Sequence, residues 1–167
     1  MLALTPGEPA GIGPECTIRL AHDHPALRVH ALDISLPFLR TLVALAERDG
    51  LELTAVHGDA LALPYRDGSF DAVASGGTLN ELGSLPQALA EQARVLRPDG
   101  RLWSMHVVRA ERPLGRALQR AMRAGGLRFP SADEVVELAD RAGLELEAQA
   151  LWPPLAITRF RRRDDSG

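Results

Sequence analysis

Two aspartates and a serine stand where short apolar segments end, and these residue types at these places could hold a polar ligand. Asp33 closes the segment VHALD, Asp59 closes LTAVHGD, and Ser75 begins Ser-Gly-Gly after FDAVA. In an open α/β sheet, ligands bind beyond the carboxyl ends of the strands. We therefore expect these residues to lie on one binding rim.

A Gly- and Pro-rich stretch near the start, TPGEPAGIGPE at 5–15, is the second candidate. Three glycines and three prolines disfavour regular structure and predict a shaped loop. Gly13 precedes Asp33 by 20 residues, close to the spacing of a βαβ cofactor-binding unit. Glu8, Gly11 and Gly13 are the residues of this loop that we expect to contact a cofactor.

Each of these residues also has a simpler structural interpretation. Gly11 and Gly13 could serve only a tight turn. Asp33 could be a carboxylate favoured by the dipole of the following helix, and Asp59 could be a turn former.

Few residues are candidates for a catalytic role or for contact with a substrate. His106, Glu81 and Tyr65 could act as a general base, whereas Gly76 and Asn80 follow a predicted strand and could line a substrate pocket. The five histidines show no ligand spacing such as HExxH, so no metal is predicted. The arginines of 109–123 are typical of a solvated helix face, with an anionic substrate as the alternative.

Composition limits the class of protein. The chain has 167 residues with 46% hydrophobic content, enough for one core. A net charge of −3 gives no general reason to expect nucleic acid or an anionic membrane as partner. Cys16 is the single cysteine, and no leader or membrane-spanning run is recognisable, so a cytoplasmic protein is expected.

Strands and helices alternate along the chain. Strands are predicted at 1–4, 28–32, 53–56, 70–74, 101–108, 144–150 and 155–160. Helices are predicted at 14–22, between Ser35 and Gly50, between Ser84 and Pro98, at 114–124, and between Ser131 and Gly143. Ser84 with Gln87 and Ser131 with Glu134 match capping boxes.

This order predicts a three-layer, Rossmann-like, doubly wound α/β sheet, mostly parallel, with an antiparallel C-terminal hairpin. We expect a single domain over 1–160 and a frayed tail over 161–167.

Three segments resemble the class I S-adenosylmethionine-dependent methyltransferases, in particular the ubiquinone and menaquinone biosynthesis group. They are VHALDIS at 29–35, VHGDALALPYRDGSFDAVASGGTLNEL at 56–82 and ALAEQARVLRPDGRLWSM at 88–105, and the resemblance extends over 29–160. It implies the class I methyltransferase fold, S-adenosylmethionine as cofactor and a small-molecule methyl acceptor. Members commonly carry helices ahead of the first strand that cover the pocket, and this sequence starts at that strand. We therefore expect a pocket that is either open or covered by a second copy in a homodimer.

The resemblance also assigns roles to single residues. Asp33 would accept hydrogen bonds from the ribose hydroxyls and Ile34 would pack against the adenine. Asp59 would face the adenine amino group with Ala60 beside it, and Ser75 would lie near the methionine end of the cofactor.

The first loop departs from the methyltransferase pattern of an acidic residue followed by GxGxG. Gly7 stands at the acidic position, and Pro9 replaces the first glycine. Residues 1–22 instead resemble the amino-terminal segment of 4-hydroxythreonine-4-phosphate dehydrogenase. The rest of that longer enzyme has no counterpart here, so we do not expect its activity. The segment is either fused or replaced, which we favour, or a glycine loop that converged on a similar sequence.

Three functions therefore remain open. The first is methyl transfer to an unidentified small molecule. The second is an inactive fusion remnant or interaction module that keeps the fold without the cofactor site. The third is a nicotinamide-binding oxidoreductase, because Gly11, Gly13 and Asp33 also fit a loose GxGxxG pattern in which Cys16 replaces the last small residue.

Overall fold

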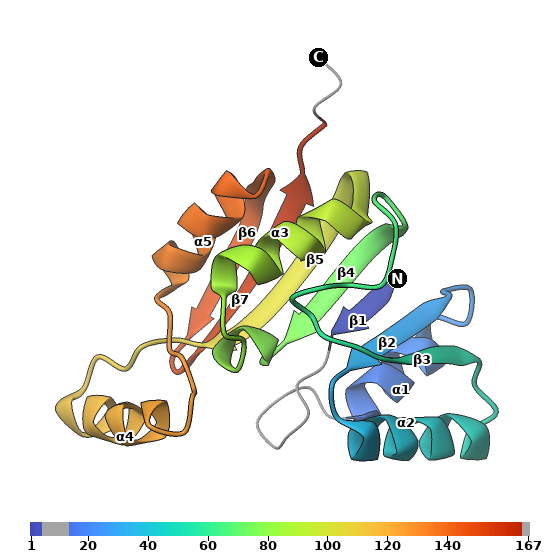
Figure 1. The fold of residues 1–167 in the computed structure, drawn as a ribbon, viewed down its shortest axis with the longest axis horizontal. Helices are drawn as coiled ribbons and strands as arrows, with labels where there is room; N and C mark the ends of the chain where they lie inside the picture. The colour runs from blue at the N-terminus through green and yellow to red at the C-terminus, as the bar shows by residue number, and fades with distance from the viewer. Residues whose placement is uncertain (5–13, 165–167) are drawn as a thin grey trace.

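A seven-stranded sheet forms the centre of the molecule (Figure 1). The computed structural model describes residues 1–4 and 14–164. The strand order is β3-β2-β1-β4-β5-β7-β6; the first five strands are parallel, and β7 runs antiparallel between β5 and β6. The strands are β1 (Leu2–Leu4), β2 (Val29–Asp33), β3 (Leu53–His57), β4 (Phe70–Gly76), β5 (Leu96–Val107), β6 (Leu144–Trp152) and β7 (Leu155–Arg162). The predicted doubly wound sheet with an antiparallel C-terminal hairpin is confirmed.

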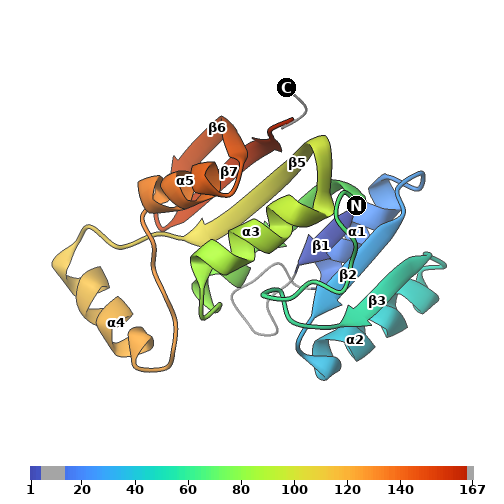
Figure 2. The same ribbon diagram turned by 45° about the horizontal axis from the view of Figure 1, so that its top comes forward.

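Helices cover both faces of this sheet. They are α1 (Pro14–Asp23), α2 (Leu36–Arg48), α3 (Leu85–Val95), α4 (Pro113–Arg123) and α5 (Ala132–Arg141), with a short 3-10 helix η1 (Thr78–Asn80). The two views place α1 and α2 on one face and α3 and α5 on the other, whereas α4 projects beside the sheet (Figures 1 and 2).

Alternation along the strands gives each face its own core. Ala31 of β2 packs with Ile18, Leu42 and Ala46 beneath α1 and α2. Its neighbour Leu32 faces the opposite side, in the larger cluster beneath α3 and α5. Two buried faces explain why β2 is apolar on both sides.

Strand ends agree closely with the sequence-based expectation, because turn residues mark them. The C-terminal half is less regular. The predicted helix ends at Pro98 and the predicted strand begins at 101. In the structure, β5 already begins at Leu96, and it includes Asp99, whose φ of 59° is left-handed. The predicted capping box is complete at Ser131 and Glu134. At Ser84, only the bond from Gln87 N to the serine oxygen is formed, because the Gln87 side chain donates instead to the Leu61 carbonyl.

The predicted frayed tail over 161–167 is wrong for its first residues. β7 runs through Arg162, which pairs with Leu144 of β6. Arg161 donates to Glu145 at 2.7 Å, and the backbone N–H of Arg163 donates to the Gly143 carbonyl at 2.9 Å. Ion pairs and backbone hydrogen bonds near the start of β6 therefore hold the chain in place beyond residue 160. Residues 165–167 lie outside the described part.

Helix α4 forms where predicted, but its apolar side faces outward. Leu114 is 84% exposed and Leu118 is 62% exposed, while the polar Gln119 is buried. Helical spacing in the sequence identifies an amphipathic helix without showing which side meets the core.

Candidate functional site

The carboxyl ends of β1, β2, β3 and β4 meet at one edge of the sheet. In the register, Leu4 of β1 lies between Leu32 of β2 and Ser75 of β4, so Asp33 is one position closer to the edge. Asp33 in turn pairs with His57, the last residue of β3. Because the strands are parallel, Asp33, the segment after His57 and the end of β4 share this edge, which we call the carboxyl rim.

Asp33 is almost completely buried at the rim, with 1% of its surface exposed. Its Oδ1 accepts a hydrogen bond from the backbone N–H of Ser35 at 2.7 Å. Ser35 is the N-cap of α2, so the carboxylate lies just ahead of a helix N-terminus, whose dipole favours negative charge. The short β2–α2 connection thus fixes a carboxylate acceptor in one orientation.

Ile34, between these two residues, is 69% exposed. A large aliphatic side chain held in solvent beside a buried carboxylate offers an apolar contact next to a polar one. This is the combination that a nucleoside requires, because it presents an apolar base face and a diol.

His57 contributes to this arrangement, although sequence reasoning gave it no role at the rim. Its Nε2 lies 3.0 Å from the Ile34 carbonyl oxygen, and the Gly58 N–H donates to the Asp33 carbonyl at 3.1 Å. Both contacts tie the end of β3 to the turn that carries Asp33 and Ile34. The available signal was its position directly before the glycine that ends the strand.

Asp59 is exposed and shapes its own turn. Its Oδ1 accepts from Leu61 N at 2.8 Å, and its carbonyl accepts from Ala62 N at 3.0 Å. Ala60 is buried at the same place. The turn-forming interpretation of Asp59 is therefore realised, and it leaves the carboxylate at the rim beside the strand that carries Asp33.

Ser75 lies in the sheet rather than on the rim surface. It is buried, and its hydroxyl has no hydrogen-bond partner among the described residues. The register aligns it with Ser104 of β5, which is aligned with Thr158 of β7. Gly76 ends β4, and Gly77 follows with a left-handed φ of 75° while donating to the Met105 carbonyl at 2.7 Å. The loop residues Glu8, Gly11 and Gly13 fall outside the described residues.

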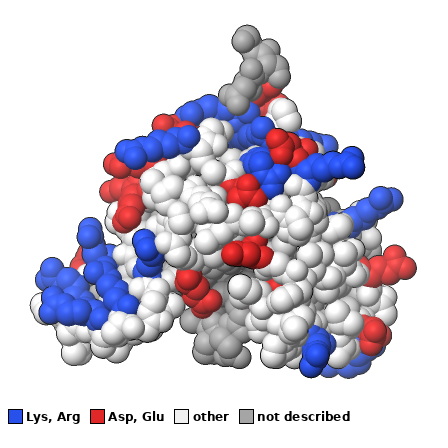
Figure 3. All heavy atoms as spheres, viewed as in Figure 1, with Lys and Arg blue, Asp and Glu red and all other residues white. Residues whose placement is uncertain are grey.

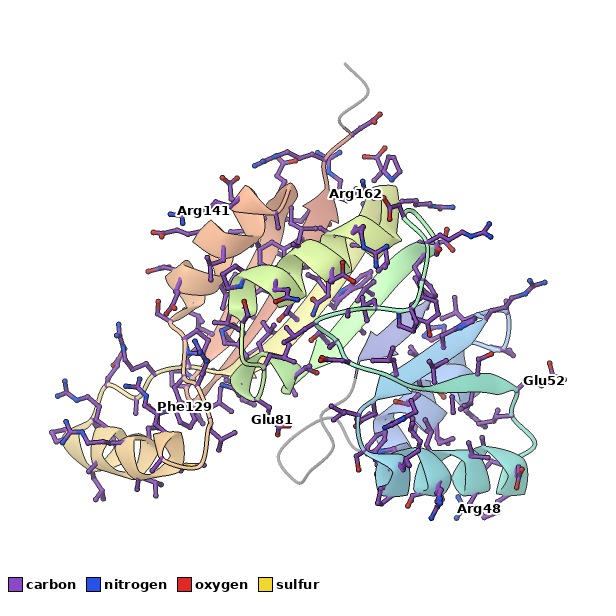
Figure 4. The ribbon with its side chains drawn as sticks, in the orientation of Figure 1. Arg48, Glu52, Glu81, Phe129, Arg141 and Arg162 are labelled. Carbon is purple, nitrogen blue, oxygen red and sulfur yellow. The ribbon has the colours of Figure 1, made fainter. Side chains whose placement is uncertain are left out.

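A cavity of about 280 Å³ lies at the same edge, beyond β4, β5 and β7 and against α4. We call it the α4 cavity. Its lining is mainly apolar and comes from Gly77, Asn80, Glu81, Val107, Ala110, Gly115, Leu118, Gln119, Met122, Leu127, Phe129 and Pro154. Figure 4 shows two of these residues, Phe129 between α4 and the sheet and Glu81 at the lower end of the sheet.

The buried amides of this lining are used to build the wall. Asn80 Nδ2 donates to the carbonyls of Val107 and Arg128, and its Oδ1 accepts from Val107 N, all at 2.7–2.8 Å. Gln119 accepts from Ala110 N at 2.8 Å and donates to the Val108 carbonyl at 2.9 Å. Asn80, predicted to line a substrate pocket, lines the α4 cavity, and its side-chain amide holds the cavity wall together.

The three general-base candidates lie in different places. Glu81 is exposed and lines the α4 cavity. His106 is fully buried in β5, has no partner among the described residues, and its pKa is lowered to about 4 by that burial. Its imidazole is therefore neutral at pH 7 and separated from solvent.

Tyr65 lies at the opposite end of the strands. It packs edge-on against Phe70, the first residue of β4, and against His30 near the start of β2. Burial raises the pKa of its hydroxyl. These contacts place Tyr65 in the core at the amino edge, away from the carboxyl rim.

Among the described residues, no group of three or more His, Cys, Asp or Glu side chains could hold a metal ion.

A larger surface hollow of about 890 Å³ lies at the amino ends of β2 and β3, lined in part by Val29, His30 and Leu53. It is on the far side from Asp33 and brings no predicted site residue together. No helix among the described residues is long and apolar enough to cross a membrane.

The amino-acid sequence matches a known domain family and several characterised enzymes. A methyltransferase domain family matches residues 10–104, from the predicted loop to the middle of β5. A demethylmenaquinone methyltransferase of Thermus thermophilus is 38% identical over 88 residues, which cover 53% of this chain and 40% of that protein. A ubiquinone/menaquinone biosynthesis C-methyltransferase of Dinoroseobacter shibae is 33% identical over 114 residues, covering 67% of this chain and 44% of the relative. The chain thus spans less than half the length of these relatives.

Solved structures share the fold over nearly the whole chain. A putative sarcosine dimethylglycine methyltransferase from Galdieria sulphuraria superposes with a TM-score of 0.81 at 16% identity, covering 98% of this chain and 78% of that one. The [4+2]-cyclase SpnF superposes with a TM-score of 0.77 at 21% identity, covering 97% and 75%. Because one of these proteins is named a cyclase, fold likeness alone does not establish methyl transfer.

Proposed function

Because the chain belongs to the methyltransferase domain family, we propose that it binds S-adenosylmethionine at the carboxyl rim and transfers the methyl group to a small apolar acceptor in the α4 cavity. The observation that carries this proposal is the buried Asp33 at the end of β2, next to the exposed Ile34. The ribose of the cofactor offers two hydroxyl donors, and a carboxylate at a strand end is well suited to accept from both.

The residues at the rim fit this cofactor. Asp33 is oriented by Ser35, and Ile34 would cover the adenine, while Asp59 and Ala60 lie on the neighbouring connection. Ser75 and Gly76 end the strand on the other side of β1, toward the α4 cavity. Glu8, Gly11 and Gly13 belong to the proposal as sequence-based assignments only.

When bound, the sulfonium supplies an already activated methyl group. The chain then has to align the acceptor and exclude water, and alignment alone can provide a large part of the rate. The α4 cavity suits that task because its amide groups are engaged and its remaining lining is mainly apolar. We assign the role of proton acceptor to Glu81, because it lines the cavity, for the case of a methyl acceptor that must lose a proton. The other candidate, His106, is buried in β5 and does not line the cavity.

A ring compound of the quinone type is the acceptor we favour, since the relatives above are named for demethylmenaquinone and ubiquinone/menaquinone biosynthesis. The apolar cavity is compatible with such a ring. The family match ends at residue 104, however, before the segment that forms most of the cavity wall. The acceptor therefore has to be tested separately from the cofactor.

Calorimetric titration with S-adenosylhomocysteine and with NAD tests the cofactor. We expect binding of S-adenosylhomocysteine alone, with an affinity about 10- to 100-fold weaker in Asp33→Asn, because charge-assisted hydrogen bonds contribute about 1.5–3 kcal/mol. Asp140→Asn, a change of the same kind on exposed α5, should leave the affinity unchanged. Binding of neither ligand would identify an inactive remnant, and binding of NAD alone would identify an oxidoreductase.

A further inference from the structure

The segment 109–128, which contains α4, differs from the rest of the chain in charge. It carries six arginines and one glutamate, a formal charge of +5 in a chain whose total is −3. None of these arginines forms an ion pair with another described residue, whereas Arg48, Arg94 and Arg161 elsewhere are each paired with a carboxylate. Figure 3 shows one group of blue atoms over α4, at the lower left, apart from those at the top and right of the view.

The same helix exposes an apolar stripe. Leu114, Leu118 and Met122 follow one another at four-residue spacing and are 84%, 62% and 39% exposed. Arg116 and Arg120 lie around the helix axis from this stripe, roughly on the opposite side, as expected from about 100° per residue. Gln119 anchors the side between them to the loop before the helix.

An anionic lipid surface is the partner that uses both features. A helix with a basic polar face and an exposed leucine stripe, but few apolar residues overall, is suited to lie in the plane of a membrane interface. Nucleic acid would use the arginines, but it would give no reason to expose Leu114 and Leu118. A second copy of this chain would cover the stripe but would bring another +5 segment close to the first.

We propose that α4 docks the protein on anionic membranes and so places the mouth of the α4 cavity at the lipid surface. Leu118 and Met122 belong both to the stripe and to the cavity lining, so an apolar molecule at the interface lies next to the cavity. This surface is independent of the carboxyl rim. Its test therefore fails or succeeds separately from cofactor binding.

Sedimentation of the full chain with vesicles tests the proposal. We expect binding to vesicles of phosphatidylglycerol mixed with phosphatidylcholine, weak binding to phosphatidylcholine alone, and release by salt. Each basic residue near an anionic surface contributes about a factor of five, so the double variant Arg116→Gln/Arg120→Gln should bind about 30-fold more weakly. Leu114→Gln leaves the cavity lining intact. It should bind the vesicles about 10-fold more weakly, because one side chain inserted into the lipid is removed.

Matched changes elsewhere serve as controls. Arg40→Gln with Arg141→Gln removes two exposed arginines from α2 and α5, and Leu151→Gln removes an exposed leucine from β6. These variants should bind vesicles like the parent chain. The proposal is overturned by equal binding to neutral vesicles or by no binding. It is also overturned by a parent dimer that Leu114→Gln dissociates, because the stripe is then a self-interface. Titration with S-adenosylhomocysteine on each variant confirms that the rim is intact.

Discussion

Asn80 joins three parts of the chain through a single side chain. Its side-chain amide contacts both backbone polar groups of Val107 and the carbonyl of Arg128, while its backbone carbonyl accepts from Arg128 N at 2.7 Å. The residue is buried, so removing the amide would leave these backbone groups without partners in a place that water does not reach easily.

We predict that Asn80→Ala lowers the free energy of unfolding by about 2–4 kcal/mol, because one change removes three buried hydrogen bonds. Chemical denaturation measured by circular dichroism checks this. The control is Gln87→Ala, which removes one exposed bond to the Leu61 carbonyl and should cost less than about 1 kcal/mol. Equal effects of the two variants would show that Asn80 has no special structural role.

His106 makes stability depend on pH. Its folded pKa of about 4 lies below the value of 6.5 for an exposed imidazole. The unfolded chain therefore binds a proton between these values that the folded chain does not bind. His106 therefore lowers the free energy of unfolding as the pH falls. The stability associated with its neutral form is fully present above pH 6.5 and is lost as the pH falls toward 4.

We predict that His106→Leu reduces the loss of stability on acidification by about 2 kcal/mol between pH 7 and pH 5. Urea unfolding of both proteins at the two pH values measures the difference. The pKa of His30 is also lowered by burial, but His30 is present in both proteins and cancels. A parent chain whose stability changes no more than that of the variant would contradict the buried, neutral state of His106.

At the scale of elements, α4 depends on few contacts. The helix lies beside the sheet rather than on it (Figure 2), and Gln119 supplies its two side-chain hydrogen bonds to the 108–110 loop. An element attached in this way opens locally more easily than the strands it adjoins.

Gln119→Ala should therefore raise the rate of amide hydrogen exchange across 113–123 by about 10-fold, since two hydrogen bonds contribute roughly 1–2 kcal/mol of local stability. Exchange in β4 and β5 should stay unchanged. Arg120→Ala on the same helix is the control, and we expect it to have little effect. Faster exchange throughout the sheet would show that α4 is part of the global core.

The sequence predicts some elements better than others for physical reasons. Strand ends at Asp33 and Gly76 are marked by polar and glycine residues, so the rim and the mostly parallel sheet with its antiparallel hairpin follow from local patterns and the family resemblance. Gln119 determines which side of α4 faces outward, because it hydrogen-bonds to the backbone nine to eleven residues earlier in the chain. The helical spacing of apolar residues does not predict this contact. Tyr65 was a candidate general base by its residue type, but its contacts with Phe70 and His30 hold it at the opposite edge of the sheet, which a residue type does not indicate.

At the scale of the whole molecule, one edge of the sheet carries two adjoining regions. The carboxyl rim lies at the ends of β1, β2, β3 and β4, and the α4 cavity lies beyond β4, β5 and β7, so the two regions meet at the end of β4 and Gly77. The cofactor half falls within the matched family segment 10–104, and most of the cavity lies beyond it. This division predicts that the two binding functions can be removed one at a time.

Met122→Gln should weaken binding of an apolar acceptor while leaving S-adenosylhomocysteine binding unchanged, because Met122 lines the cavity and lies on none of the strands that form the rim. At about 100 times its Kd, S-adenosylhomocysteine should stabilise both the parent and this variant by about 2.7 kcal/mol, a rise in Tm of about 5–10 °C. Asp33→Asn should reduce that rise. Differential scanning calorimetry measures the Tm, and initial rates at varied acceptor concentration measure the KM, which should increase only in Met122→Gln. If Met122→Gln instead abolished the cofactor-dependent rise, the rim and the cavity would form a single coupled site.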